Sequence, residues 1–208
     1  MKNPKTPTKL LLGMLATGLC LGANNLHAQS KAIDVNKSSL KIRVFKSGAF
    51  SAFAHDHEIE AVIQDGKIDE GKTDKGKTDS SGSPSVQLRV DARKMRVLDP
   101  GTPPDKRAEI QHTMQSAKVL DVEKFPEISY QSTKVTSHGD ARWEVQGILS
   151  LHGMKQPVVV EVTLRDGHYL GSASFKQSSF GIDPIRIAGG TVKVKDELKI
   201  EFDIVSAE

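Results

Sequence analysis

The feature that most constrains the fold is an alternation of apolar and polar residues with a period of two. Val86, Leu88 and Val90, for example, alternate with Gln87 and Arg89, so in an extended strand they occupy opposite faces. The same pattern recurs at residues 33–45, 127–135, 142–152, 156–165, 168–177 and 191–205. Strands of this kind bury one face and expose the other, which predicts an antiparallel sheet.

Turn residues separate these segments. Asp166-Gly167 and His138-Gly139-Asp140 are typical of hairpins, and His152-Gly153 followed by Pro157 indicates another reversal. At residues 195–197 the apolar residues change face, which predicts a turn or bulge. Short connections between about eight strands favour a barrel that can hold one small ligand. The sequence therefore predicts an all-β protein, an eight-stranded antiparallel barrel with one short helix near one end, and a sandwich of two sheets is the alternative.

The predicted helix covers residues 102–117. Thr102 can cap it, Pro103 suits a first helical position, and Asp105 is favourable in the first turn. A modest apolar stripe runs along it, at Ala108, Ile110, Met114 and Ala117. A single helix among strands is expected to close one end of the barrel.

The first 28 residues have the layout of a secretory signal peptide. Lys2, Lys5 and Lys9 precede an apolar run at residues 10–23, and a polar chain follows. The run is too short to span a bilayer. We expect cleavage after about Ala28 and a periplasmic protein.

Residues 29–208 are expected to form one binding domain, in which residues 65–84 are a polar, flexible loop. Removing the three leader lysines leaves 26 basic and 26 acidic residues, a formal charge of zero. No basic surface for nucleic acid is therefore expected. The single cysteine, Cys20, lies in the leader, which excludes disulfides and thiol chemistry from the exported domain.

The segment 48–63 places two histidines in the same alternation. In an extended strand, one face would carry Ala49, Ser51, Phe53, His55, His57, Ile59, Ala61 and Ile63. The other face would carry Asp56, Glu58 and Glu60 toward water. Two imidazoles on an apolar face are either core histidines bonded to nearby backbone or hydroxyl groups, or polar tips in a lined cavity.

Four segments carry a resemblance to a known family. They are FAHDHEIEA at 53–61, MQSAKVLDVEKFPEISYQSTKV at 114–135, GILSLHGMKQPV at 147–158 and FGIDPIRIAGGTVKVKDELKIEFDI at 180–204. On these segments the chain resembles the YceI-like family of exported, lipocalin-like proteins, in the branch with a His-Asp-His segment. The resemblance implies an eight-stranded barrel with an elongated apolar pocket. The implied role is binding of polyisoprenoids, isoprenoid quinones or fatty-acid derivatives.

A long-chain ligand requires a continuous apolar wall, because each buried methylene contributes roughly 0.8 kcal/mol. The candidate ligand-binding residues are Phe53, His55, His57, Ile59, Ile63, Val86, Leu88, Tyr130, Trp143, Val145, Leu149, Val158, Val160 and Phe202. Taken singly, an apolar residue of this set is more often ordinary core, since most buried apolar residues simply pack. The expected partner is a lipid or isoprenoid and not nucleic acid, and no cofactor is expected. A transient membrane contact and a homodimer are left open.

The sequence leaves two other functions to consider, metal binding and catalysis. His55 and His57, two apart on one strand, could hold a metal or haem iron, but a stable zinc site needs further ligands. Catalysis has no motif in its support: the chain contains no Gly-x-Ser-x-Gly elbow and no phosphate-binding loop, and Asp56 would face away from both histidines. If the histidines only line a cavity, leucine at both positions should leave the fold intact.

Overall fold

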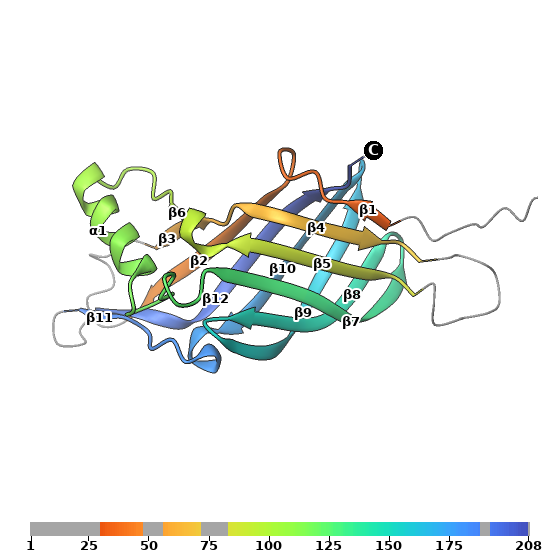
Figure 1. Ribbon diagram of the computed structural model, residues 1–208. Coiled ribbons are helices and arrows are strands. Elements are labelled where there is room, and N and C mark those ends of the chain that lie inside the picture. Colours follow the sequence, from red (N-terminus) through yellow and green to blue (C-terminus); the bar gives the residue numbers. More distant parts are fainter. Residues whose placement is uncertain (1–29, 48–55, 72–82, 188–191, 208) are drawn as a thin grey trace, which may run out of the picture.

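A computed structural model of the protein describes residues 30–47, 56–71, 83–187 and 192–207. Within these ranges it is an all-β structure with one short helix, and its antiparallel sheet is strongly curled (Figure 1). This architecture agrees with the predicted barrel class.

The strands pair in the order β1-β4-β5-β7-β8-β9-β10-β12-β2-β3-β6, and β11 pairs with β12. The first six are β1 (Ser30–Ala32), β2 (Ser39–Ser47), β3 (His57–Glu60), β4 (Ile63–Asp69), β5 (Ser85–Asp91) and β6 (Arg96–Val97). The others are β7 (Glu127–Gly139), β8 (Arg142–Leu151), β9 (Met154–Arg165), β10 (His168–Lys176), β11 (Arg186–Ile187) and β12 (Val192–Val205). The helix is α1 (Pro104–Gln115), and two 3-10 turns are η2 (Ala92–Lys94) and η3 (Gln177–Phe180).

The predicted count of eight strands is wrong, since the described sheet has twelve. Ala61 and Val62 separate β3 from β4, and η2 separates β5 from β6. Because β3 pairs with β6 and β4 pairs with β5, both breaks fall at the same corner of the sheet. The alternation continues through Ala61 and Ile63, so the sequence pattern could not show this corner.

The predicted loop at residues 65–84 begins too early, because β4 extends to Asp69 and Ile68 is buried. With one large apolar residue in its last five positions, this strand gives little sequence signal. Residues 72–82 lie outside the described part of the chain.

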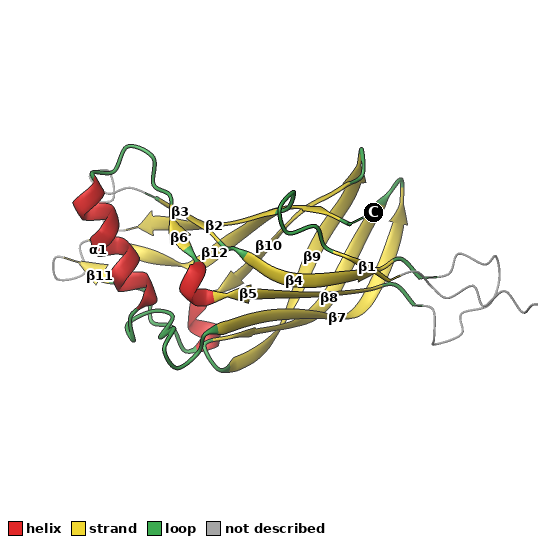
Figure 2. Cartoon of the chain, turned by 45° about the horizontal axis from the view of Figure 1, so that its top comes forward, coloured by secondary structure: helices red, strands yellow, loops and turns green. Residues whose placement is uncertain are grey.

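Backbone hydrogen bonds around Ile33 connect β4 to the end of β12. The amide of Ile33 donates to Gly66 O (2.9 Å), and the amide of Asp34 donates to Val205 O (2.8 Å). A third bond runs from the Ala207 amide to Ala32 O (2.7 Å). The sheet therefore curls back on itself here, and its backbone groups are paired rather than left as an open edge (Figure 2).

The predicted turns are confirmed. Asp166 and Gly167 have φ of 51° and 81°, and His152 and Gly153 have φ of 52° and 75°, which suits tight hairpins. The register shift in β12 falls between Val194 and Leu198, where a bulge was expected.

The helix lies at one end of the sheet (Figures 1 and 2). The predicted cap is wrong: Pro103 occupies the N-cap position and no side-chain cap is made. Instead the Gln111 side chain accepts from Val97 N (2.8 Å) and donates to Met95 O (2.9 Å). Because Gln111 thereby bonds to backbone groups in and just before β6, it anchors α1 to this end of the sheet.

Two glycines on the inner wall lie beneath aromatic rings. A Cβ on Gly171 would collide with Phe202 and with the Glu161 carbonyl, and one on Gly147 would collide with Tyr130. We predict that Gly171→Ala lowers the free energy of unfolding by about 1–3 kcal/mol through overpacking. Urea unfolding checks this, with Ser172→Ala on the opposite face as the control; equal stability of the two variants would contradict it.

Candidate functional site

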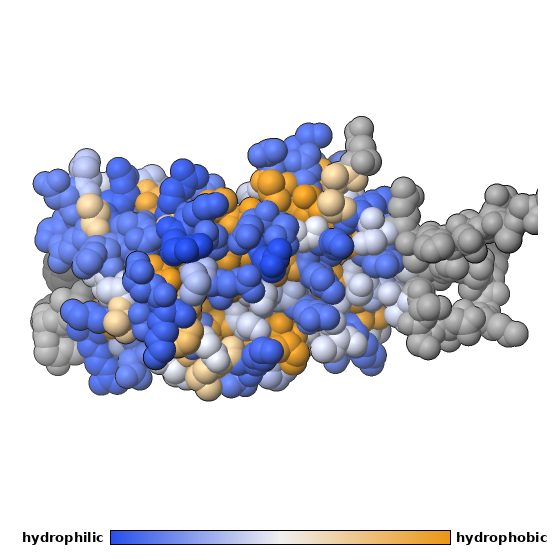
Figure 3. Space-filling model, in the orientation of Figure 1, coloured by the Kyte–Doolittle hydropathy of each residue, from blue (hydrophilic) through white to orange (hydrophobic). Residues whose placement is uncertain are grey.

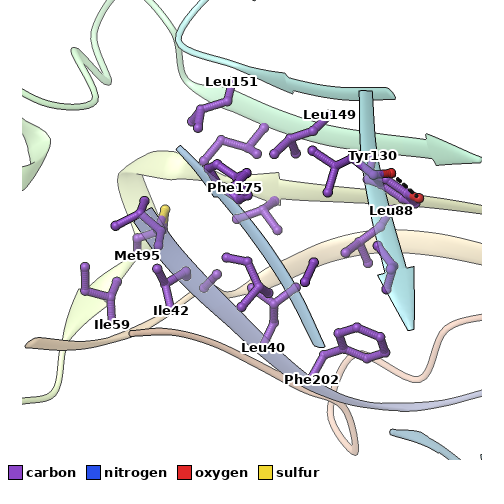
Figure 4. A pocket seen from close by; sticks show the side chains of 18 of the residues that line it. Leu40, Ile42, Ile59, Leu88, Met95, Tyr130, Leu149, Leu151, Phe175 and Phe202 are labelled. Atoms are coloured by element: carbon purple, nitrogen blue, oxygen red, sulfur yellow. Dashed lines mark hydrogen bonds between the residues drawn. The ribbon is translucent and has the colours of Figure 1, made fainter. Parts of the chain in front are cut away.

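The curled sheet encloses a cavity of about 1460 Å³. This is larger than the roughly 300–1000 Å³ of typical small-molecule pockets. Its walls are the inner faces of the strands, from which side chains such as Leu40, Leu88, Leu149 and Phe175 point into the same space (Figure 4). The wall is predominantly aliphatic and aromatic.

Most of the predicted ligand-binding residues lie in this wall. They are His57, Ile59, Val86, Leu88, Tyr130, Trp143, Val145, Leu149, Val158, Val160 and Phe202. Phe53 and His55 lie outside the described residues. Ile63 is not among the residues that line the cavity. It is buried in a cluster with Ile33, Ile68 and Ile204, which do line it. The corner before β4 changes the environment of Ile63 even though its parity matches that of Ile59.

Sequence reasoning left out other parts of the wall. From β2 and β12 these are Leu40, Ile42, Val44, Leu198, Ile200 and Ile204. Their alternation was visible, but nothing in it distinguished cavity wall from packed core. Ile110 and Met114 of α1 also line the cavity, so the weak apolar stripe of the helix covers one of its ends.

Tyr130 contributes a polar group to the wall. Its hydroxyl lies 3.0 Å from Val145 O and 3.3 Å from Val158 O, and it donates to these carbonyls (Figure 4). Burial raises the pKa of Tyr130 to about 12, so the phenol stays neutral. This hydroxyl is therefore uncharged and already has acceptors for its hydrogen.

His57 has a partner that the sequence did not reveal. Its Nδ1 lies 2.6 Å from Oδ2 of Asp99, whose side chain is only 1 % exposed. Oδ1 of Asp99 accepts a hydrogen bond from the Glu58 amide (2.8 Å). Asp99 precedes Pro100 and Gly101 in a turn, and this turn sequence is the only signal that could have drawn attention to it.

This pair revises the expectation that leucine would be tolerated at His57. We predict that His57→Leu lowers the free energy of unfolding by about 1–3 kcal/mol, because the buried Asp99 carboxylate loses a hydrogen-bond donor. Urea unfolding checks the loss, with His168→Leu as the control. His168 bonds Asp203 at 2.7 Å, but both side chains are about half exposed. A midpoint for His57→Leu no lower than that of the control would contradict the prediction.

The end of the cavity remote from α1 carries a chain of polar contacts. The Tyr169 hydroxyl donates to Glu70 Oε1 (2.7 Å), which also accepts from Lys31 Nζ (3.1 Å). The Tyr169 bond, followed by the Lys31 bond, lowers the pKa of Glu70. Because Tyr169 lies on β10 and Glu70 follows β4, these contacts connect β10 to the end of β4.

The Tyr169–Glu70 contact predicts a pH-dependent stability difference. A carboxyl whose pKa is lowered by folding stabilises the fold above its unfolded pKa, and this contribution is lost as pH falls through the folded value. Tyr169→Phe should therefore reduce stability at neutral pH by less than about 1 kcal/mol, given the exposure of Glu70. Chemical unfolding at several pH values checks this: the difference from wild type should shrink in acid, and a difference that grew in acid would contradict it.

The opening beside α1 is bordered by basic groups, among them Lys106, Lys118, Arg186 and Lys193. Lys106 is paired with Glu109 at 3.0 Å. Charged side chains thus lie near the two ends of the cavity, while the central wall is apolar.

The outer face seen in Figure 3 is mostly hydrophilic, with small scattered hydrophobic groups. Val35, Met154 and Val159 are the large hydrophobic residues exposed in the described part of the chain. No helix among the described residues is long and apolar enough to cross a membrane. The large continuous apolar surface is therefore the inner one.

A metal site is not assembled within the described ranges, which contain no group of three or more histidine, cysteine, aspartate or glutamate side chains suited to one ion. His55, the second histidine of the proposed pair, lies outside them. The metal alternative thus stays a prediction.

Comparison with known proteins gives a consistent picture. A model of the YceI-like domain matches residues 32–206. A UPF0312 protein of Vibrio cholerae serotype O1 (strain M66-2) is 29% identical over 128 residues, which span 56% of this chain and 61% of that protein. A UPF0312 protein of Pseudomonas savastanoi pv. phaseolicola is 41% identical over 56 residues, covering 27% of this chain and 29% of the relative.

Among solved structures, Burkholderia cenocepacia BcnA has a similar fold. The TM-score is 0.61 at 18% sequence identity, and the match covers 85% of this chain and 99% of BcnA. At this identity the similarity concerns the fold alone. The matched segments span less than two thirds of the length of the UPF0312 relatives.

Proposed function

The chain belongs to the YceI-like domain family, and from this premise we propose that it is an exported protein that holds a long-chain apolar ligand in its cavity. The ligand is a polyisoprenoid, an isoprenoid quinone or a fatty-acid derivative. The layout of residues 1–28 supports export to the periplasm. The proposal is a binding function without catalysis.

The observation that carries this proposal is the large apolar cavity inside the sheet. Inner side chains such as Ile42, Val90 and Leu151 are packed into the wall, yet a space of about 1460 Å³ remains between the walls. Side chains that face such a cavity lack dispersion contacts on one side, and an aliphatic chain would supply them. The neutral, satisfied hydroxyl of Tyr130 adds no charge that would oppose a hydrocarbon.

Affinity should rise with ligand chain length until the cavity is full. Each buried methylene contributes roughly 0.8 kcal/mol, or about fourfold in affinity. Displacement of the fluorophore Nile red by a series of straight-chain alcohols measures this increment. A series without any dependence on chain length would contradict burial of the chain.

A paired substitution localises the binding to the interior. Ala173 lines the cavity, whereas its neighbour Ser172 does not. We expect Ala173→Trp to weaken binding of the longest alcohols more than tenfold because the indole occupies their space, and Ser172→Trp to leave it unchanged. Equal effects of the two variants would contradict binding inside the barrel. Elemental analysis of the purified protein tests the metal alternative in parallel.

A further inference from the structure

His57 lies where the apolar cavity meets a polar groove on the outside of the barrel. Phe45, Lys46, His57 and Thr102 line both spaces. The His57 side chain is 26 % exposed, and its alternation partner Ile59 is buried in the wall. A ligand whose chain fills the cavity can therefore place its terminal group beside this imidazole.

The charges of the outer groove are largely matched. Arg43 pairs with Glu58 and, at 3.2 Å, with Glu201. Lys199 pairs with Glu201 at 2.9 Å. Because these cations already have carboxylate partners, the groove favours a neutral polar group over an anion.

Asp99 determines which nitrogen of His57 carries hydrogen. An ionised carboxylate only accepts hydrogen bonds. Since Oδ1 takes the Glu58 amide and Oδ2 lies 2.6 Å from Nδ1, the hydrogen of the neutral imidazole is on Nδ1. Nε2 of His57 then presents a lone pair. No described residue makes a hydrogen bond to this atom. Nε2 is also not a buried atom without a partner, so it is accessible.

The backbone of Asp99 has a conformation that is unusual for a residue other than glycine. Its φ is 25°, in the left-handed region that residues other than glycine seldom adopt. Its carbonyl accepts from the Thr102 amide at 3.0 Å. The turn therefore fixes a buried carboxylate behind an imidazole whose far nitrogen is accessible.

We propose that His57, positioned by Asp99, accepts a hydrogen bond from the terminal hydroxyl of a long-chain alcohol whose hydrocarbon lies in the cavity. This inference rests on the proposed function and narrows its ligand class to molecules that end in a neutral donor. His57 is the group that contacts the ligand, and Asp99 is a positioning residue.

Matched ligands test the inference. Hexadecanol can donate a hydrogen bond, whereas hexadecyl methyl ether can only accept one. We expect wild-type protein to bind the alcohol about fivefold more tightly, the value of one net hydrogen bond. Competition against Nile red measures both affinities.

Asp99→Asn separates positioning from packing. The backbone amide of Glu58 needs an acceptor, so the side-chain oxygen of the introduced asparagine must take the place of Oδ1. The side-chain NH₂ group introduced by Asp99→Asn must then face Nδ1 of His57. The imidazole hydrogen then moves to Nε2, which can donate to alcohol and ether alike, and the fivefold preference should fall to about one. Asparagine tolerates a positive φ, so the turn is preserved. The ¹⁵N spectrum of the histidines, assigned by comparison with His57→Leu, should show the exchange of tautomers.

Asp203→Asn is the matched control, because Asp203 bonds His168 in the same manner but neither residue lines the cavity. The preference for alcohol should be unchanged in it. Equal binding of alcohol and ether by wild type, a preference that persists in Asp99→Asn, or a wild-type spectrum with hydrogen on Nε2 would overturn the inference while leaving the carrier function intact. Absence of binding by Nile red and both ligands would instead refute the carrier function itself.

Discussion

The backbone hydrogen-bond ladder holds the walls of this protein apart. Each strand is bonded to its neighbours, and the bonds around Ile33 connect β4 to the end of β12. The inner side chains therefore cannot collapse onto one another as they would in a sandwich, where two sheets pack about 10 Å apart. The interior cavity follows from this geometry.

The distribution of polarity follows the same geometry. Salt bridges such as Arg43–Glu201 and Arg89–Asp65 lie on the outer faces of the strands, and the contact between Tyr169 and Glu70 lies at one end. On the inside, Tyr130 donates to the carbonyls of its own wall. A hydrocarbon chain in the cavity would therefore contact few unsatisfied polar groups apart from His57.

The sequence predicted what depends on local pattern. Alternation located the long strands, and Gly153 and Gly167 marked hairpins because their positive φ suits glycine. The sequence did not show the corner at Ala61, because the corner arises from pairing: β3 pairs with β6, whereas β4 pairs with β5. Asp99 was missed because it is brought to His57 only by the folded chain, across 42 positions. The burial of Ile63 beside Ile33 depends on the same folded arrangement, since parity specifies a face and not the neighbours behind it.

The central claim is that the interior of the barrel holds a long-chain molecule. Native mass spectrometry of protein purified under gentle conditions, followed by organic extraction and lipid analysis, tests it most directly. The account predicts an additional mass that stays with the folded chain, is released on unfolding and is identified as a long-chain lipid or isoprenoid, and is reduced in Ala173→Trp. A bound mass that is a metal or haem, or a lipid retained equally by Ala173→Trp and Ser172→Trp, would contradict it.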